Sequence, residues 1–188
     1  INKSLGNLNL AAEQAKISIE IEGNNRWYQL NYAKILLDNQ DFKLASVEYK
    51  KLLLREPGNK ELYFLLADSY IYDNEYLNAI EVYDDLEQIN GIDKMVSMQK
   101  HKLYMQLEKK RLAINELQNL LEKNPNEIET LEILSELYLL NDEKEKAFDI
   151  LKKIATIAPK SGRIHLTLAD YYRQQGDNFK SFEELKLA

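Results

Sequence analysis

The chain has 188 residues, 45% of them hydrophobic, which is enough to build a buried core. It carries 31 acidic and 25 basic residues, a net charge of -6, and its basic residues form no stripe with interleaved aromatics, so nucleic-acid binding is disfavoured. No run reaches the roughly 18 uncharged apolar residues of a membrane span, and the lack of cysteine excludes disulfides and thiol chemistry.

The N-terminal third predicts three helices. From Leu8 to about Glu22, apolar and small residues recur at helical spacing. Gly23-Asn24-Asn25 breaks this helix, and residues 27–39 are predicted as the next one. A turn at residues 39–41 precedes a helix over residues 42–55, which Pro57 ends because proline cannot continue the hydrogen-bond ladder.

The same helix-turn-helix unit recurs through the rest of the chain. It is predicted at residues 60–89, 93–123 and 126–157, and from residue 161 to the end. The residues at which three of these units begin, Asp93, Asn126 and Ser161, are suitable N-caps.

Several columns of residues repeat at intervals of 34. One column holds small residues: Ala45, Ala79, Ala113, Ala147 and Ser181. Another holds mainly tyrosines: Leu36, Tyr70, Tyr104, Tyr138 and Tyr172. Such spacing indicates an internal repeat, with Pro57, Pro125 and Pro159 at the ends of units and Gly91 where a fourth proline would stand.

This pattern resembles the tetratricopeptide repeat, with its 34-residue helix pairs and small residues at the helix crossings. The resemblance implies an all-α, right-handed superhelical solenoid of antiparallel helix pairs, in which the first helices line a concave surface. The predicted array is a partial repeat at 1–25 and repeats at 26–59, 60–93, 94–127, 128–161 and 162–188, the last truncated. The array is therefore expected to begin and end inside a longer one.

The third repeat departs from the pattern. Lys100 and His101 stand where the family has a large apolar residue and a small one. We expect this helix pair to be spread, or its first helix to be rotated.

The resemblance also implies which side chains face the concave surface. This predicted peptide-binding set is Trp27, Leu30, Lys34, Phe64, Asp68, Tyr72, Met95, Met98, Lys102, Met105, Glu129, Glu132, Glu136, Arg163 and Arg173. All three methionines fall in one repeat, and methionine adapts readily to a partner's surface. The alternatives are that the apolar members only fill the seam between helices and that the glutamates form a solvated helix face.

Catalysis finds little support. The two histidines, His101 and His165, lie in different repeats at packing positions, without a serine or carboxylate at a persuasive spacing. The acidic clusters lack a calcium-loop pattern. The chain is therefore predicted not to be an enzyme and to need no metal or cofactor.

The leading hypothesis is a scaffold that holds a peptide or helix of a partner protein. The alternative is an assembly segment of a longer repeat protein, which stacks on neighbouring repeats or self-associates through apolar ends at residues 5–10 and 179–187. The composition, rich in Lys, Ile, Asn and Tyr, suggests a bacterial source. The absence of cysteine fits a cytoplasmic and an exported protein equally.

Overall fold

The computed structural model describes residues 2–22 and 25–188, and the side chains of residues 8–22 and 25–188. Within these residues every regular element is an α-helix, which confirms the predicted all-α class. The chain forms two compact units, residues 1–96 (unit 1) and residues 97–188 (unit 2), and each is described by itself. The predicted helix break at Gly23 and Asn24, and the side chain of Leu5, lie outside the described residues.

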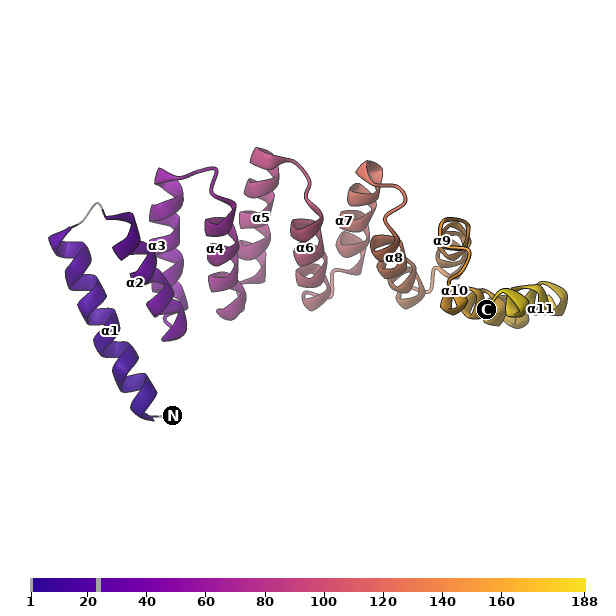
Figure 1. Ribbon diagram of the computed structural model, residues 1–188, viewed down its shortest axis with the longest axis horizontal. Helices are drawn as coiled ribbons and strands as arrows, with labels where there is room; N and C mark the ends of the chain where they lie inside the picture. Colours follow the sequence, from indigo (N-terminus) through magenta and orange to yellow (C-terminus); the bar gives the residue numbers. More distant parts are fainter. Residues whose placement is uncertain (1, 23–24) are drawn as a thin grey trace. The chain divides into compact units, whose positions relative to one another are not determined.

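Unit 1 is a stack of helices in which each packs on its neighbours in sequence (Figure 1). Its helices are α1 (Asn2–Ile21), α2 (Arg26–Asp38), α3 (Phe42–Arg55), α4 (Lys60–Tyr72) and α5 (Tyr76–Asn90). Ala45 and Ala79, at the predicted small positions, are completely buried, so adjacent helices approach closely there. The core around them is completed by large side chains that are at most 3% exposed, Tyr49, Leu52, Leu62, Leu66 and Tyr83.

Unit 2 follows the same plan. Its helices are α6 (Lys94–Gln106, shared with unit 1), α7 (Lys110–Lys123), α8 (Ile128–Leu140), α9 (Lys144–Ile157), α10 (Gly162–Gln174) and α11 (Asn178–Leu187). One apolar cluster surrounds Ala113 and Ala147, and a second surrounds Leu131, Ile154 and Leu168. The first helices α2, α4, α6, α8 and α10 begin 34 residues apart, which is the interval of the sequence repeat.

The turn inside each helix pair has one recurring backbone conformation. Gln40, Asn74, Glu108, Asp142 and Gly176 all have φ between 58° and 78°, in the left-handed region. A side chain at this φ crowds the following carbonyl, so four of the five turns are strained at a position that suits glycine. Gly176 is the only one of these five residues whose type indicates a left-handed conformation in the sequence.

Replacing Glu108 by glycine is expected to raise the free energy of unfolding by about 0.5–1 kcal/mol, because glycine adopts the left-handed conformation without strain. Asn74→Gly should gain less, since asparagine tolerates this region. Gly176→Ala, the reverse change at the same turn position, should be destabilising. Urea unfolding of the three variants measures the differences, and a Glu108→Gly variant less stable than the wild type would contradict the explanation.

The helix caps partly match the predictions. Asp93 caps α6, since its carboxylate accepts hydrogen bonds from the backbone N–H groups of Met95 and Val96. Ser161 precedes α10 but makes no side-chain cap bond. Asn126 was the wrong residue for α8: the cap is Glu127, whose carboxylate accepts from the Thr130 N–H at 2.7 Å. Its longer side chain still reaches the first free N–H groups of the helix.

Gly91 ends α5 with φ at +76°, a conformation that glycine adopts without strain. Where other helix pairs are followed by a proline, α5 is ended by this glycine. The helix therefore extends to Asn90.

The irregular third repeat contains a buried ion pair. Lys100 and Glu116 are 5% and 7% exposed, and their ammonium and carboxylate groups are 2.9 Å apart. Ala113, at the small position of α7, remains completely buried. The expectation that a lysine here spreads the helix pair or rotates α6 omitted a third arrangement, in which a carboxylate from the second helix neutralises the lysine inside the core.

Candidate functional site

The predicted binding residues of unit 1 lie on the first helices α2 and α4, and they differ widely in exposure. Trp27 is 70% exposed and Tyr72 is 59% exposed, whereas Leu30 is only 6% exposed and belongs to the core. Phe64 is partly buried and packs edge-on against Tyr83, with ring centroids 5.4 Å apart. The large apolar surface available to a partner is therefore carried by Trp27 and Tyr72.

Both exposed rings are held by neighbouring side chains. The Tyr72 ring stacks on Phe42 of α3, with centroids 5.6 Å apart. The guanidinium of Arg26 lies 5.2 Å from the centre of the Trp27 ring, in the geometry of a cation–π contact. These contacts reduce the freedom that each ring would lose on binding.

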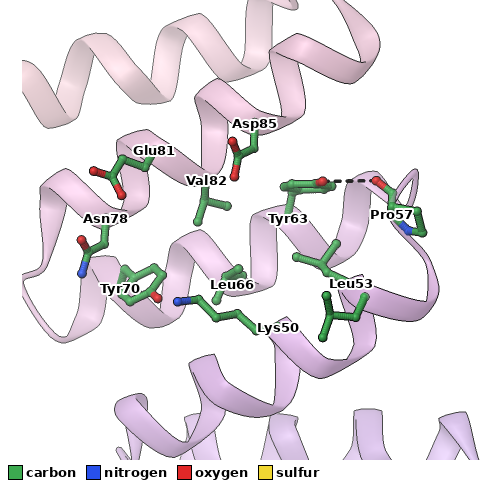
Figure 2. A pocket seen from close by; sticks show the side chains of 11 residues that line it. Lys50, Leu53, Pro57, Tyr63, Leu66, Tyr70, Asn78, Glu81, Val82 and Asp85 are labelled. Atoms are coloured by element: carbon green, nitrogen blue, oxygen red, sulfur yellow. Dashed lines mark hydrogen bonds between the residues drawn. The ribbon is translucent and has the colours of Figure 1, made fainter.

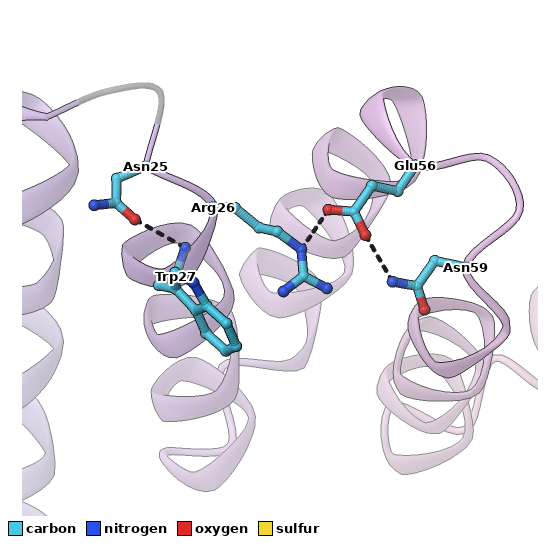
Figure 3. A network of polar contacts seen from close by, with 5 residues as sticks. All are labelled: Asn25, Arg26, Trp27, Glu56 and Asn59. Atoms are coloured by element: carbon cyan, nitrogen blue, oxygen red, sulfur yellow. Dashed lines mark hydrogen bonds and ion pairs between the residues drawn. The ribbon is translucent and has the colours of Figure 1, made fainter.

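A polar network fixes Arg26 (Figure 3). Its Nε donates to the carboxylate of Glu56, which also accepts from the Asn59 amide at 2.7 Å. The Arg26 hydrogen bond, followed by that of Asn59, holds the pKa of Glu56 below its ordinary value. At the start of α2, the Asn25 side chain caps the helix by accepting from the Trp27 N–H at 3.0 Å. The network connects the starts of α2 and α4 through the end of α3.

Three charged side chains also lie on these two helices. Lys34 of α2 pairs loosely with Glu61 of α4 at 3.7 Å, and both are largely exposed. Asp68 is partly buried, and burial raises the pKa of its carboxyl. Its carboxylate has no hydrogen-bond or ion-pair partner among the described residues. A desolvated carboxyl without a partner is a candidate for binding a donor from outside the protein.

The three methionines of α6 are not equally accessible. Met95, in unit 1, is 56% exposed. Met98 and Met105, in unit 2, are partly buried and pack against the apolar cluster around Ala113 and Leu134. They therefore serve the core at least in part, as the alternative interpretation of the sequence expects, while Lys102 beside them is exposed.

In unit 2 the predicted acidic residues of α8 lie beside basic residues of α10. Arg163 forms an ion pair with Glu132, and Arg173 pairs with Asp170 of its own helix at 2.8 Å. Glu129 and Glu136 are exposed. The exposed pairs are worth little energetically, so this surface is weakly negative and readily rearranged.

The two histidines are buried in opposite environments. His101 is 8% exposed, its Nδ1 lies 2.7 Å from the Met98 carbonyl oxygen, and burial lowers its pKa. His165 is 4% exposed, with Nδ1 2.7 Å from a Glu184 carboxylate oxygen and Nε2 3.1 Å from the Pro159 carbonyl oxygen. Both therefore occupy packing positions. Among residues 2–22 and 25–188, no three His, Asp or Glu side chains are placed to hold a metal ion.

The pKa of His165 is raised, chiefly by its hydrogen bond to Glu184. A raised folded pKa stabilises the fold fully below the unfolded value of about 6.5, and this contribution is lost as the pH rises through the folded pKa. Between about pH 6 and pH 9 the wild type should therefore lose more stability than Glu184→Gln, in which the hydrogen bond to a charged carboxylate is gone. Urea unfolding at both pH values checks this, and equal losses would contradict it.

Lys100 is unusual in the sequence, but its partner Glu116 is not. The register position of Glu116 is Val82 or Ile150 in the neighbouring second helices, but Glu48 and Glu184 in α3 and α11. A glutamate at this position therefore did not mark the pair.

Part of the chain matches a known family of repeat proteins. Residues 30–91 match the family model described as tetratricopeptide repeat. Over 120 residues, 64% of this chain, the sequence is 31% identical to the BBSome complex member BBS4 of Bos taurus. The matched part is 23% of that protein's length. None of the helices in residues 2–22 and 25–188 combines the length and apolar character needed to cross a membrane.

Three solved structures share the fold. MamA is 21% identical, with a TM-score of 0.59 over 82% of this chain and 91% of that one. YrrB, described as a TPR protein with an unusual peptide-binding site, is 18% identical, with a TM-score of 0.56 over 94% and 91%. A tetratricopeptide repeat protein from Parabacteroides merdae is 20% identical, with a TM-score of 0.60 over 96% and 72%. At these identities the likeness establishes the helical solenoid fold.

Proposed function

Since the chain is a tetratricopeptide repeat protein, we propose that it is a non-catalytic scaffold whose first helices bind a peptide or a helix of a partner protein. Proteins of this fold bind protein partners, which supports the general role. The observation that carries the specific proposal is the exposure of Trp27 and Tyr72 on successive first helices of one unit. Large exposed aromatic residues are typical anchors of protein interfaces.

The polar residues around these anchors supply orientation. Asp68 can accept a hydrogen bond from a backbone N–H or a basic group of the ligand, and in doing so it recovers the solvation that burial removed. The weak Lys34–Glu61 pair can open to meet a peptide's own charges at little cost. Met95 extends this surface of unit 1. In unit 2 the corresponding proposal rests on Met98, Lys102 and Met105, and on the glutamates of α8 with Arg163 and Arg173.

A phage-displayed library of random peptides tests the binding site without knowledge of the natural partner. Peptides enriched on the wild-type chain are expected to bind the double variant Trp27→Ser/Tyr72→Ser at least about tenfold more weakly. The matched control is Leu44→Ser/Ile89→Ser, which removes two exposed apolar residues from second helices and should leave affinity unchanged. Equal binding of the enriched peptides to the folded Trp27/Tyr72 variant would reject this site.

Exposed apolar residues on α11 favour a second candidate, association through that helix. Leu151 of α9 is 6% exposed in the apolar cluster with Leu168 of α10, whereas Leu185, at the same register in α11, is 51% exposed. Phe148 stacks on Tyr171, whereas Phe182, at its register, is 57% exposed. If this helix mediates self-association, light scattering will show a mass that rises with concentration and that Phe182→Ser reduces. A monomer at high concentration would exclude it.

A further inference from the structure

A second surface of unit 1 lies away from the residues of the proposed site, on the second helices. Its floor is formed by Tyr63, Leu66 and Tyr70 of α4, and its walls by α3 and α5 (Figure 2). Together these side chains enclose about 610 Å³. Volumes of roughly 300–1,000 Å³ are typical of ligand-binding clefts. We call this hollow the α3–α5 groove.

The same hollow recurs at other positions of the repeat, where polar side chains bridge it. Between α1 and α3 it measures about 450 Å³, and Gln29 donates a hydrogen bond to Glu48 there. Between α7 and α9 it measures about 580 Å³, and Gln118 donates to the Tyr138 hydroxyl at 2.8 Å. The helix packing thus creates a hollow at each of these places. The buried floor of the α3–α5 groove belongs to this packing, whereas Leu54 at its lip is exposed.

The lining of the α3–α5 groove is exceptional at Leu54. This side chain is 85% exposed, at the lip of the groove, whereas Glu20 and Glu122 line the other two hollows at the same register. On the opposite wall Val82 replaces Glu48 of the first hollow. An exposed leucine beside an apolar floor costs solubility without contributing to the core, so a role in binding explains it.

The tyrosines of the floor are fixed in place and are each only 8% exposed. The Tyr63 hydroxyl donates to the Pro57 carbonyl oxygen at 3.2 Å, which satisfies its polar end and holds the ring in place (Figure 2). The ammonium group of Lys50 lies 5.3 Å from the centre of the Tyr70 ring. The floor is thus rigid before any ligand arrives, which lowers the entropy cost of binding.

The wall of α5 supplies the charge. Glu81 and Asp85 stand one turn apart, both exposed, and neither carboxylate has an ion-pair or hydrogen-bond partner within the described part of the chain. At the same registers in α9, Asp149 pairs with Lys152 at 2.7 Å and Lys153 replaces the second acid. Of the three hollows compared, the α3–α5 groove alone has two unpaired carboxylates beside an apolar floor, and they complement a basic group.

From these observations we propose that the α3–α5 groove binds a short peptide segment of a partner protein in which apolar side chains are followed by Arg or Lys. The apolar side chains contact Leu54, Leu66, Tyr63 and Val82, and the basic group pairs with Glu81 and Asp85. This inference does not depend on the site proposed for the first helices, since the two share no residue.

Fluorescence anisotropy with synthetic peptides tests the proposal on the whole chain. The probe is a labelled nonapeptide with a Leu-Leu-Phe core followed by two arginines, and the comparison peptide carries two glutamates instead. We expect the arginine peptide to bind more tightly, with a preference that shrinks at high salt. Equal binding of the two peptides, or no binding of the arginine peptide, would overturn the proposal.

Variants separate the contributions of the groove. Leu54→Glu, which installs the residue of the other two hollows, should weaken binding of the arginine peptide at least about tenfold. Glu81→Gln/Asp85→Asn should weaken it about fivefold, because exposed ion pairs are individually weak. Asp149→Asn, which removes a carboxylate at the Glu81 register of unit 2, and Trp27→Ser, which alters the first helices, should have no effect. Circular dichroism verifies that each variant is folded, as the exposure of these side chains leads us to expect.

Two other results would count against the proposal. Binding that survives Leu54→Glu places the peptide elsewhere. A concentration-dependent dimer that Leu54→Glu converts to a monomer assigns the groove to a second copy of the chain.

Discussion

Replacing Lys100 by leucine is expected to lower the free energy of unfolding by about 3–5 kcal/mol, as is replacing Glu116 by isoleucine. Each single change removes the 2.9 Å contact and leaves the other member charged at a position that is 5–7% exposed. The double variant Lys100→Leu/Glu116→Ile carries residues found at the same registers of other repeats, Leu134 and Ile150. It should be about as stable as the wild type or more stable.

Urea unfolding of the four proteins measures the coupling between the two residues. The matched control is Lys102→Leu, two residues along the same helix at an exposed position, which should change stability by less than about 0.5 kcal/mol. If Lys100→Leu alone were neutral, the carboxylate of Glu116 would have to be hydrated or protonated at no cost, and the pair would not be a structural element of the core.

The second large effect is expected from Ala147→Leu, at the small position of α9. Ala147 is completely buried against Leu134, Leu137 and Tyr138 of α8. Three extra carbon atoms cannot fit without moving α9 away from α8, so we expect a loss of about 1–3 kcal/mol. Alanine and leucine have similar helix propensities, so the loss will report packing and not helix formation.

Thr156→Leu is the control for this experiment, because it adds a leucine at an exposed position of the same helix. Its effect should stay within about 0.5 kcal/mol. Similar destabilisation by the two leucines would show that the small column is not a close-packing requirement. Thermal unfolding followed by circular dichroism at one heating rate is sufficient for the comparison.

Much of the fold could be predicted from spacing. The columns of Ala45 to Ala147 and of the tyrosines fixed the interval, and the interval dictates paired helices because each pair must bury one face against the next. The left-handed backbone conformation of the turns was harder to predict. Four of the five turns place glutamine, asparagine, glutamate or aspartate at this position, and only Gly176 is the residue type that favours it. There the packing of the helices imposes the backbone conformation, and the local residue merely tolerates it.

The candidate sites could be predicted only in part. Register places a residue on a helix but does not determine how deeply neighbouring side chains cover it. Trp27 and Leu30 belong to the same predicted surface, yet one is 70% exposed and the other 6%. Leu54 was missed because a single exposed leucine is unremarkable in a sequence. Its meaning depends on the floor that α4 provides beneath it.

The Lys100–Glu116 pair also bears on how a repetitive chain avoids assembling out of order. Neighbouring repeats are similar enough that one second helix could dock on the wrong first helix during folding, a known failure of repeat proteins. If α6 docked on α5 or α9 in place of α7, Lys100 would meet Val82 or Ile150 and lose the carboxylate of Glu116. The pair therefore penalises docking on the two neighbouring second helices, although α3 and α11 carry Glu48 and Glu184 at this register.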